Sequence, residues 1–266
     1  MAVLLTTPAV TGTSGYTLLI ADTAAQVAAA QRLRYTVFVE EFGAKLSSPV
    51  PGLDVDEFDA HCEHLIVRED RTGAVVGTYR MLPPDRVAQA GGRYAEAEFD
   101  LTPLAPLRDG LVEIGRSCVD PAHRSGAVIN LMWAGIARYL HLRGLRWLAG
   151  CGSVPLGDGG ATAVGVWAEV QRRHLSPPPM RVRPHRPWLA EPSGAAALSE
   201  VSPGEAVASR GRVPMPPLLR GYLRLGAWVC GEPAYDPAFD SADFYVLFSL
   251  DRMPDRYRRH FLGPDQ

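Results

Sequence analysis

The sequence lacks several features that would assign it to whole classes of protein. Its four cysteines are widely spaced and form no Cys-x-x-Cys pair, which argues against a zinc site and a disulfide framework. No run approaches the roughly 20 apolar residues of a membrane-spanning helix, so any membrane role is limited to peripheral contact. The first residues lack a basic segment followed by a long apolar core. We therefore expect no signal peptide and a reduced, cytoplasmic setting.

An excess of charge of one sign is also lacking. The formal net charge is −2 and the pI is about 6.4, so nothing in the charge balance indicates a nucleic-acid partner. What is present is typical of a globular protein: 47% of the residues are hydrophobic and 21% are charged. A chain of 266 residues is long enough to bury a substantial core.

Apolar runs alternate with helical patterns along the chain, which predicts an α/β fold around one mixed sheet. We expect strands at residues 17–22, 64–70, 74–82, 111–119, 145–154 and 243–251. We expect helices from a cap at Asp22 or Thr23 to Phe42, from near Ser125 to Leu140, and at residues 161–175. Arg71-Thr72-Gly73 indicates a hairpin between the second and third strands.

The predicted domain organisation is simple. Residues 1–16 are interpreted as an N-terminal tail, and residues 17–266 as a single domain. Ten of the 23 prolines fall between Ser176 and Pro217, which indicates an irregular insertion at about residues 176–217. The basic stretch RYRRHF closes the chain as a tail.

A dense acidic cluster lies between Leu53 and His64. Its members are Asp54, Asp56, Glu57, Asp59 and Glu63, beside His61 and His64. Carboxylates this close together repel one another, so we expect a cationic partner: an arginine, a metal or an ammonium substrate. Salt bridges to Arg34 or Arg80 are favoured, because a guanidinium in an apolar segment needs a partner; a solvated charge run is the alternative. The two histidines have poor spacing for a chelate, and no metal is expected.

Glu113 lies in the middle of an apolar strand, where a carboxylate is rarely buried unless it is paired. Arg116 follows three residues later, so a regular strand places it on the opposite face, whereas a bulge could bring the two together. A functional role and a structural pair both remain open for Glu113. Cys118 has no local base to activate it, and we interpret it as a buried strand cysteine and not as a nucleophile.

The turn before the helix at Ser125 is a candidate anion site. Arg124, Ser125 and Gly126 flank a helix N-terminus, where unpaired N–H groups favour negative charge. The alternative is that these residues only shape the turn. Five further arginines are candidates for a docking surface that binds an acidic protein or anionic lipid. The alternative is that they lie at solvated helix ends. They are Arg138, Arg143, Arg146, Arg172 and Arg173.

Several segments together resemble the bacterial L-ornithine N-acyltransferases of ornithine-lipid biosynthesis. These are members of the GNAT superfamily that use acyl carrier protein thioesters. The segments are RYTVFVEEFG, DEFDAHCEHLIV, VVGTYRML, EFDL, EIGRSCVDPAHRSGAVINLMWAGIARYL, GCGSVPL, RVRP, LLRGYLRLGAWVCGEPAYDPAF, DFYVLFSLD and RYRRHFLG. They cover nearly the whole chain outside the first residues and residues 191–212. More distantly, the pattern is similar to the acyl-homoserine lactone synthases.

The resemblance implies a GNAT-like (acyl-CoA N-acyltransferase) fold, with a central mixed twisted sheet flanked by helices. It also implies a set of functional residues: substrate-binding Arg34, Asp56, Asp59 and Arg80, and catalytic Glu113 and Arg116. One motif departs from the pattern. The GNAT signature Arg/Gln-x-x-Gly-x-Gly/Ala is not met, because Gly126 comes one step early after Arg124. A carrier-bound phosphopantetheine has one phosphodiester and no adenine nucleotide, so Arg124, Ser125 and Gly126 are expected to bind its phosphate.

The implied activity moves a fatty acyl group, 3-hydroxylated by family analogy, from acyl carrier protein to the α-amine of L-ornithine, giving lyso-ornithine lipid. Glu113 is the expected base and backbone N–H groups the oxyanion donors. Asp56 and Asp59 are expected to neutralise an arginine and leave excess negative charge for an ornithine ammonium. No cofactor, metal or covalent intermediate is needed. The alternatives are an acyl-homoserine lactone synthase or other amine acyltransferase, and a non-catalytic acyl-carrier or lipid-binding protein.

Overall fold

The structure is a computed structural model that describes residues 3–7, 15–190 and 215–263. Its contacts divide the chain into two compact units. Unit 1 comprises Met1–Gly92, Gly110–Trp147 and Asp255–Gln266, and unit 2 comprises Arg93–Asp109 and Leu148–Pro254. That residues 17–266 form one domain stays a prediction. Within the described ranges, no helix is long and apolar enough to cross a membrane.

Unit 1 is built on an antiparallel meander in the order β1-β2-β3-β4-β6. The strands are β1 (Val3–Thr7), β2 (Tyr16–Ile20), β3 (Glu63–Glu69), β4 (Val75–Leu82) and β6 (Leu111–Val119). The hairpin between β3 and β4 is confirmed, with Gly73 in the left-handed region at φ +74. β1 lies in the segment interpreted as a tail, and this difference has a simple cause: its short apolar run becomes a strand only by pairing with β2.

The helices of unit 1 begin and end close to the predicted positions. They are α1 (Ala24–Tyr35), a π-helix η1 (Thr36–Glu41), α2 (Ala127–Leu142) and α7 (Asp255–Leu262). Thr23 caps α1, since its side chain accepts a hydrogen bond from the Gln26 backbone N–H. Two differences stand out. The helix predicted to reach Phe42 widens into a π-helix after Tyr35, and the basic C-terminal stretch is a helix.

Short 3₁₀ helices complete the unit at Glu57–Ala60 (η2), Pro84–Arg86 (η3) and Pro121–His123 (η6).

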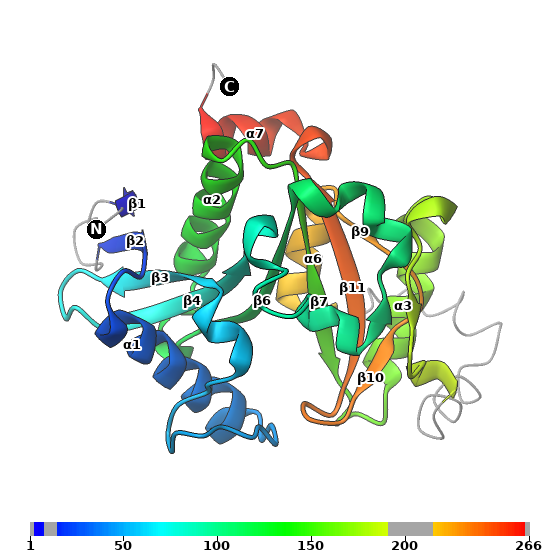
Figure 1. Ribbon diagram of the computed structural model, residues 1–266, viewed down its shortest axis with the longest axis horizontal. Coiled ribbons are helices and arrows are strands. Elements are labelled where there is room, and N and C mark those ends of the chain that lie inside the picture. Colours follow the sequence, from blue (N-terminus) through cyan, green and yellow to red (C-terminus); the bar gives the residue numbers. More distant parts are fainter. Residues whose placement is uncertain (1–2, 8–14, 191–214, 264–266) are drawn as a thin grey trace. The chain divides into compact units, whose positions relative to one another are not determined.

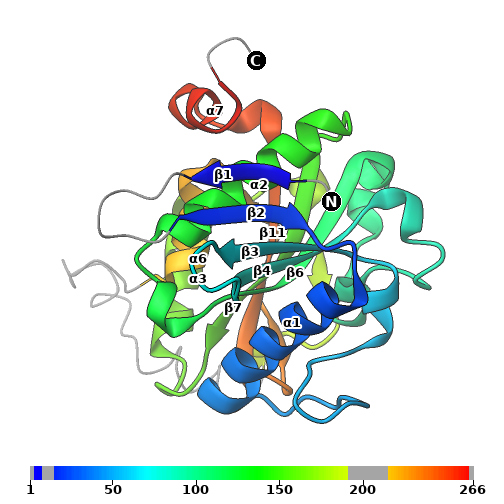
Figure 2. The same ribbon diagram turned by 90° about the vertical axis from the view of Figure 1, so that its left-hand side faces the viewer.

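α1 and α2 cover opposite faces of this meander (Figure 2). On the α1 face, Leu19 and Ile66 pack with Ala30 of the helix. On the α2 face, a Cβ added at Gly77 would lie 2.6 Å from Val128 Cγ1, so the helix approaches β4 closely because a glycine is there. Arg80 is three residues from Gly77 on β4 and therefore faces α1.

Unit 2 contains the strand order β7-β11-β10, with β9 also paired to β11, and a two-stranded sheet of β5 and β8. The strands are β5 (Phe99–Asp100), β7 (Trp147–Pro155), β8 (Arg183–Pro184), β9 (Trp228–Val229), β10 (Ala234–Asp236) and β11 (Ser241–Ser249). Trp188, Phe99, Phe244 and Tyr245 are buried in this unit. Figure 1 shows the strands in sequence order by colour.

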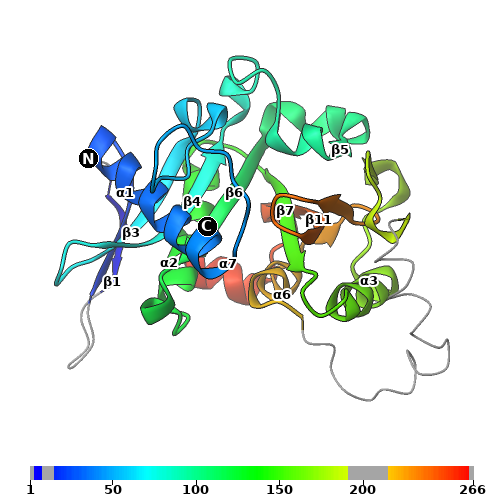
Figure 3. The ribbon, with the colours of Figure 1, turned by 90° about the horizontal axis from the view of Figure 1, so that it is seen from below.

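The helices of unit 2 include α3 (Ala161–Arg173) and α6 (Pro217–Arg224), which lie along the same side of β7 and β11 (Figure 3). Short 3₁₀ helices lie at Tyr94–Ala97 (η4), Thr102–Gly110 (η5), Pro178–Met180 (η7), Trp188–Ala190 (η8) and Leu250–Arg252 (η9). The predicted insertion at about residues 176–217 begins with η7, β8 and η8, and residues 191–214 lie outside the described ranges.

Candidate functional site

Arg34 of α1 is fully buried and is held by two aspartates of unit 1. Its Nη1 and Nη2 donate to Asp59 Oδ1 and Oδ2 at 2.9 and 2.8 Å, a bidentate pair. Its Nε lies 2.9 Å from Asp54 Oδ2, and Nη2 also donates to the Asp54 carbonyl oxygen. Carboxylates this close compensate the charge of a buried guanidinium. The predicted salt bridge between Arg34 and the acidic cluster is therefore confirmed.

Arg80 of β4 makes the second predicted pair. Its Nη1 donates to Asp56 Oδ1 at 2.5 Å and to Asp59 Oδ1 at 3.1 Å, and its guanidinium carbon lies 5.8 Å from the centre of the Phe58 ring. Burial by itself would raise the pKa of Asp59, but the hydrogen bonds and charge of Arg34, with the charge of Arg80, hold that pKa well below its usual range. Asp59 is therefore a permanent anion at neutral pH.

A local capping arrangement holds the aspartates in place. Asp56 is the N-cap of η2 and accepts from the Phe58 N–H at 3.0 Å, while Asp59 accepts from the Asp56 N–H at 3.3 Å. His64 Nε2 lies 3.1 Å from the Asp59 carbonyl oxygen, and burial lowers the pKa of this histidine. Asp56 and Asp59 therefore lie at the two ends of one 3₁₀ capping turn.

A β-bulge in β6 decides the position of Arg116. The register passes from Thr78 opposite Cys118 to Arg80 opposite Gly115, so β6 contains one extra residue there, and Arg116 adopts φ +50. The bulge turns Arg116 toward the acidic cluster. Its Nε donates to Asp54 Oδ2 at 3.2 Å, and its Nη2 lies 3.5 Å from Asp56 Oδ2. Glu113 and Arg116 therefore share the α1 face of the meander, as the bulged alternative requires.

The ion pairs of this cluster join equal numbers of aspartates and arginines. Three aspartates (Asp54, Asp56 and Asp59) meet three arginines (Arg34, Arg80 and Arg116) in the ion pairs above. Asp59 also accepts from Gln31 Nε2 at 3.1 Å. Strand pairing and the bulge bring two guanidinium groups besides Arg34 to these carboxylates. That Asp56 and Asp59 retain negative charge for an ammonium stays a prediction.

Glu113 is 5% exposed and lies opposite Leu82 in the β4–β6 ladder. Residues opposite one another in an antiparallel pair project to the same face, so Glu113 shares the face of Arg80. Burial raises the pKa of the nearby Cys62 thiol to about 12, and the charge of Glu113 acts on it in the same direction. Glu113 thus lies within electrostatic reach of the cluster, on a rigid strand, where a carboxylate can serve as a positioned base.

The residues before α2 are arranged differently from the sequence expectation. Arg124 forms a bidentate ion pair with Glu41, with Nη1 and Nη2 donating at 2.6 and 2.7 Å. Gly126 is the N-cap of α2 at φ +99 and provides no side-chain cap. Burial raises the pKa of Cys118, which agrees with its interpretation as an inert strand cysteine. Phosphate binding by Arg124, Ser125 and Gly126 stays a prediction.

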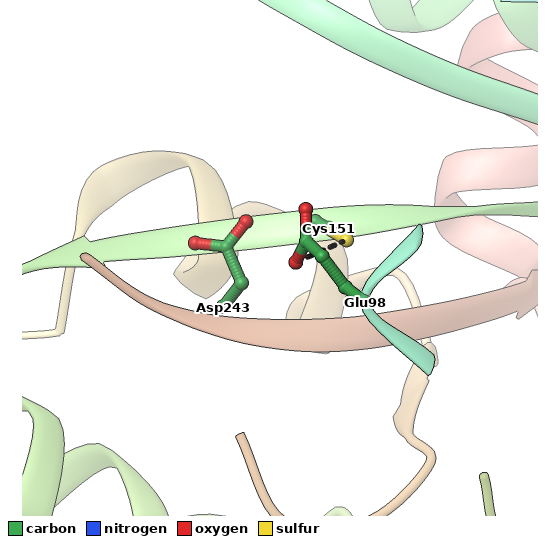
Figure 4. Close-up of side chains that lie close together, drawn as sticks. All are labelled: Glu98, Cys151 and Asp243. Atoms are coloured by element: carbon green, nitrogen blue, oxygen red, sulfur yellow. Dashed lines mark hydrogen bonds between the residues drawn. The ribbon is translucent and has the colours of Figure 1, made fainter. Parts of the chain in front are cut away.

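A second group of polar residues in unit 2 was missed by the sequence analysis. Glu98, Cys151 and Asp243 each offer one ligand atom, and these atoms lie within 4.8 Å of one another (Figure 4). Cys151 Sγ donates to Glu98 Oε2 at 3.8 Å, and Asp243 Oδ1 accepts from Ser241 Oγ at 2.7 Å. Their chemistry suits a divalent cation or an ammonium group. The available signal was weak: each residue lies in a segment that carries the resemblance, but the segments are far apart in sequence.

Comparison with known proteins identifies the family. Residues 33–134 match the family described as Acetyltransferase (GNAT) domain. The L-ornithine N(alpha)-acyltransferase of Rhodobacter capsulatus is 35% identical over 254 residues, which cover 92% of this chain and 94% of that one. The protein of the same name from Rhizobium meliloti is 33% identical, covering 91% and 82%. The chain belongs to the L-ornithine N(alpha)-acyltransferase family. It is accordingly an N-acyltransferase with bacterial relatives, as the resemblance implied.

Solved structures support the fold of this acyltransferase. The acyl-homoserine lactone synthase LasI is similar with a TM-score of 0.50 at 14% identity, covering 94% of this chain and 96% of that one. The synthase BjaI, solved with MTA, is similar with a TM-score of 0.52 at 16% identity, covering 91% and 84%. The prediction of an α/β, GNAT-like fold is confirmed. The roles of the individual site residues remain predictions.

Proposed function

We propose that this acyltransferase moves a fatty acyl group from acyl carrier protein to the α-amine of L-ornithine, giving lyso-ornithine lipid. The observation that carries the proposal is the identity of 32–35% to relatives named L-ornithine N(alpha)-acyltransferase, over at least nine-tenths of this chain. The ordered cluster of buried arginines and aspartates beside Glu113 supports a dedicated catalytic region in unit 1.

The proposed chemistry needs a base and an oxyanion site. The α-ammonium of ornithine gives a proton to Glu113, directly or through water, and the freed amine attacks the thioester carbonyl. The tetrahedral oxyanion is stabilised by backbone N–H groups near the end of β6. The intermediate then loses the second proton of the attacking amine and collapses: the C–N bond is kept as an amide, the C–S bond breaks, and the phosphopantetheine thiolate leaves and takes up that proton. No redox step or covalent enzyme intermediate is required.

We assign different roles to the members of the balanced cluster. Arg34 and Asp59 are deeply buried and joined by a bidentate pair, so they brace α1 against η2 and β4. The Asp56 side chain is 19% exposed, compared with 6% for Asp59, so it is the aspartate that a substrate ammonium reaches. Arg116, whose side chain is 10% exposed, lies beside it and is suited to the ornithine carboxylate. Arg80 fixes the position of Asp56.

The donor is assigned to acyl carrier protein because of the loop before α2. The glycine at Gly126 disturbs the signature that wraps the pyrophosphate of CoA, whereas Arg124 and the start of α2 suffice for a single phosphodiester. Phosphopantetheine carries that one phosphodiester. On this reading the carrier protein is the partner and L-ornithine is the acceptor, and contact with a membrane is limited to release of the amphiphilic product.

The test is expression of the chain in a bacterium that makes no ornithine lipids, followed by mass spectrometry of the extracted lipids. We expect a new N-acyl-ornithine in cells with the wild-type chain and none in cells with Glu113→Gln at equal protein level. Finding an acyl-homoserine lactone instead would contradict the assigned acceptor. Finding neither product, although the folded protein binds acyl carrier protein, would favour a non-catalytic binding protein.

A further inference from the structure

We propose that Glu41 is an internal competitor for the donor phosphate, occupying the Arg124 guanidinium until the donor displaces it. This inference rests on the proposed function, in which Arg124 binds the phosphate of the acyl donor. Glu41 is the last residue of the π-helix η1, and its two carboxylate oxygens accept from Nη1 and Nη2 of Arg124 at 2.6 and 2.7 Å. The two side chains are 31% and 39% exposed.

The end-on fork of Arg124, formed by Nη1 and Nη2, is occupied by Glu41. Arg124 Nε donates to the Val119 carbonyl oxygen at 3.0 Å, which fixes the guanidinium to the end of β6. Four N–H donors remain on Nη1 and Nη2, and Glu41 accepts from one on each nitrogen, which is the end-on fork that binds either a carboxylate or a phosphate in bidentate fashion. A donor phosphate therefore reaches this fork only by displacing Glu41.

The position of Glu41 depends on the π-helix. α1 ends at Tyr35, and the wider turns of η1 carry the chain on to Glu41 and Phe42. The Phe42 ring lies 5.8 Å from the guanidinium carbon of Arg124 and is 62% exposed. π-Helical segments are often found at functional sites. Here the segment delivers a carboxylate and an aromatic ring to one arginine.

The exchange is energetically accessible because the ion pair is partly exposed to solvent. Exposed pairs typically change an equilibrium by about fivefold or less. A phosphodiester carries one negative charge, as the Glu41 carboxylate does, but at Arg124 it also lies near the start of α2, where Gly126 provides no side-chain cap for the backbone N–H groups. The expected consequence is that the donor binds more weakly than it would if Arg124 were not paired with Glu41.

The experiment measures binding of a hydrolysis-resistant acyl carrier protein conjugate by calorimetry. Glu41→Gln removes the competing charge and should lower the donor Kd by about two- to fivefold, with the ornithine KM unchanged. Glu40→Gln is the matched control. Glu40 is exposed and adjacent to Glu41, but among the described residues the ion pair to Arg124 is made by Glu41. Glu40→Gln should leave the donor Kd unchanged. In an Arg124→Ala background, Glu41→Gln should have no effect. The same binding measurements with acyl-CoA distinguish the two sources of phosphopantetheine phosphate, which are acyl carrier protein and CoA.

Three results would overturn the proposal. A weaker donor affinity in Glu41→Gln would mean that Glu41 orients Arg124 and does not compete. An equal gain in donor affinity in Glu40→Gln would mean that the effect comes from the loss of any nearby negative charge and not from the ion pair. A gain that persists without Arg124 would place the effect elsewhere. None of these results contradicts the proposed function if the wild-type protein acylates ornithine. If the wild-type protein does not acylate ornithine, the proposed function is wrong, and the binding experiment still tests the role of Glu41.

Discussion

At the residue scale, Asp59 is the predicted site residue whose structural role can be tested directly. Its two oxygens accept from Arg34, Arg80, Gln31 and the Asp56 backbone. Asp59→Asn leaves Arg34 and Arg80 short of one negative charge, so we expect a loss of about 3–5 kcal/mol of unfolding free energy. The measurement is the denaturant midpoint of the purified variant.

Asp56→Asn is the matched variant, because Asp56 lies in the same 3₁₀ turn but has a more exposed side chain. We expect Asp56→Asn to be less destabilising and to raise the KM for ornithine. An Asp59→Asn protein of normal stability, with only ornithine saturation impaired, would show that Asp59 binds the substrate and that Asp56 does not.

Glu113 is the residue for which chemistry and stability can be separated. Glu113→Gln keeps the shape and hydrogen-bonding capacity of the side chain but removes its basic charge. We expect turnover to fall by about a hundredfold or more, the usual scale for a lost general base, with little change in melting temperature. If the variant melts much earlier than the wild type, Glu113 is a structural partner of the buried arginines, and the base lies elsewhere.

At the scale of secondary structure, the bulge in β6 both aims Arg116 and holds its backbone in the left-handed region. Two substitutions separate these effects, because Arg116→Ala and Arg116→Gly remove the same guanidinium. Only glycine adopts φ +50 without steric cost, so we expect Arg116→Gly to be more stable than Arg116→Ala by about 1 kcal/mol. Thermal melts of the two variants provide the measurement.

Turnover of both Arg116 variants should be low, since each lacks the side chain that contacts Asp54 and Asp56. If alanine and glycine give equal stability, the left-handed conformation at position 116 contributes no strain. If either variant retains wild-type turnover, the guanidinium has no part in the reaction.

At the scale of the whole molecule, the proposed donor is a carrier protein and not only a thioester. We expect acyl carrier protein thioesters to be used far better than the same acyl chain on CoA, with added salt weakening carrier binding. Arg143→Gln with Arg146→Gln should raise the KM for the carrier substrate and leave the KM for ornithine unchanged. Steady-state kinetics at two ionic strengths provide the comparison.

The matched control is Arg71→Gln with Arg108→Gln. It removes the same net charge from two highly exposed arginines, whose side chains are 75% and 74% exposed. Glutamine is chosen at Arg143 because its guanidinium lies 3.4 Å from Asp85 and 3.7 Å from Glu63, where a reversed charge would add repulsion. Equal efficiency with acyl-CoA and no effect of salt would contradict the assignment of the carrier protein.

Local sequence was sufficient for the features that depend on near neighbours. The cap at Thr23, the hairpin at Gly73 and the start of α2 after Gly126 follow from backbone preferences over a few residues. The cost of burying a charge allowed one longer-range prediction. A guanidinium in an apolar segment needs an anionic partner, so the salt bridges to the aspartates could be expected. Resemblance over the whole chain added the family, the fold and the set of candidate residues.

Features that depend on contacts far along the chain appeared only in the tertiary structure. The third arginine of the cluster arrives through a bulge, Glu41 reaches Arg124 across 83 positions, and Glu98, Cys151 and Asp243 come from three separate strands or turns. β1 is a strand because β2 pairs with it. The reason is physical: periodicity and propensity report which way a side chain points along its own element, whereas charge balance and register depend on which elements meet.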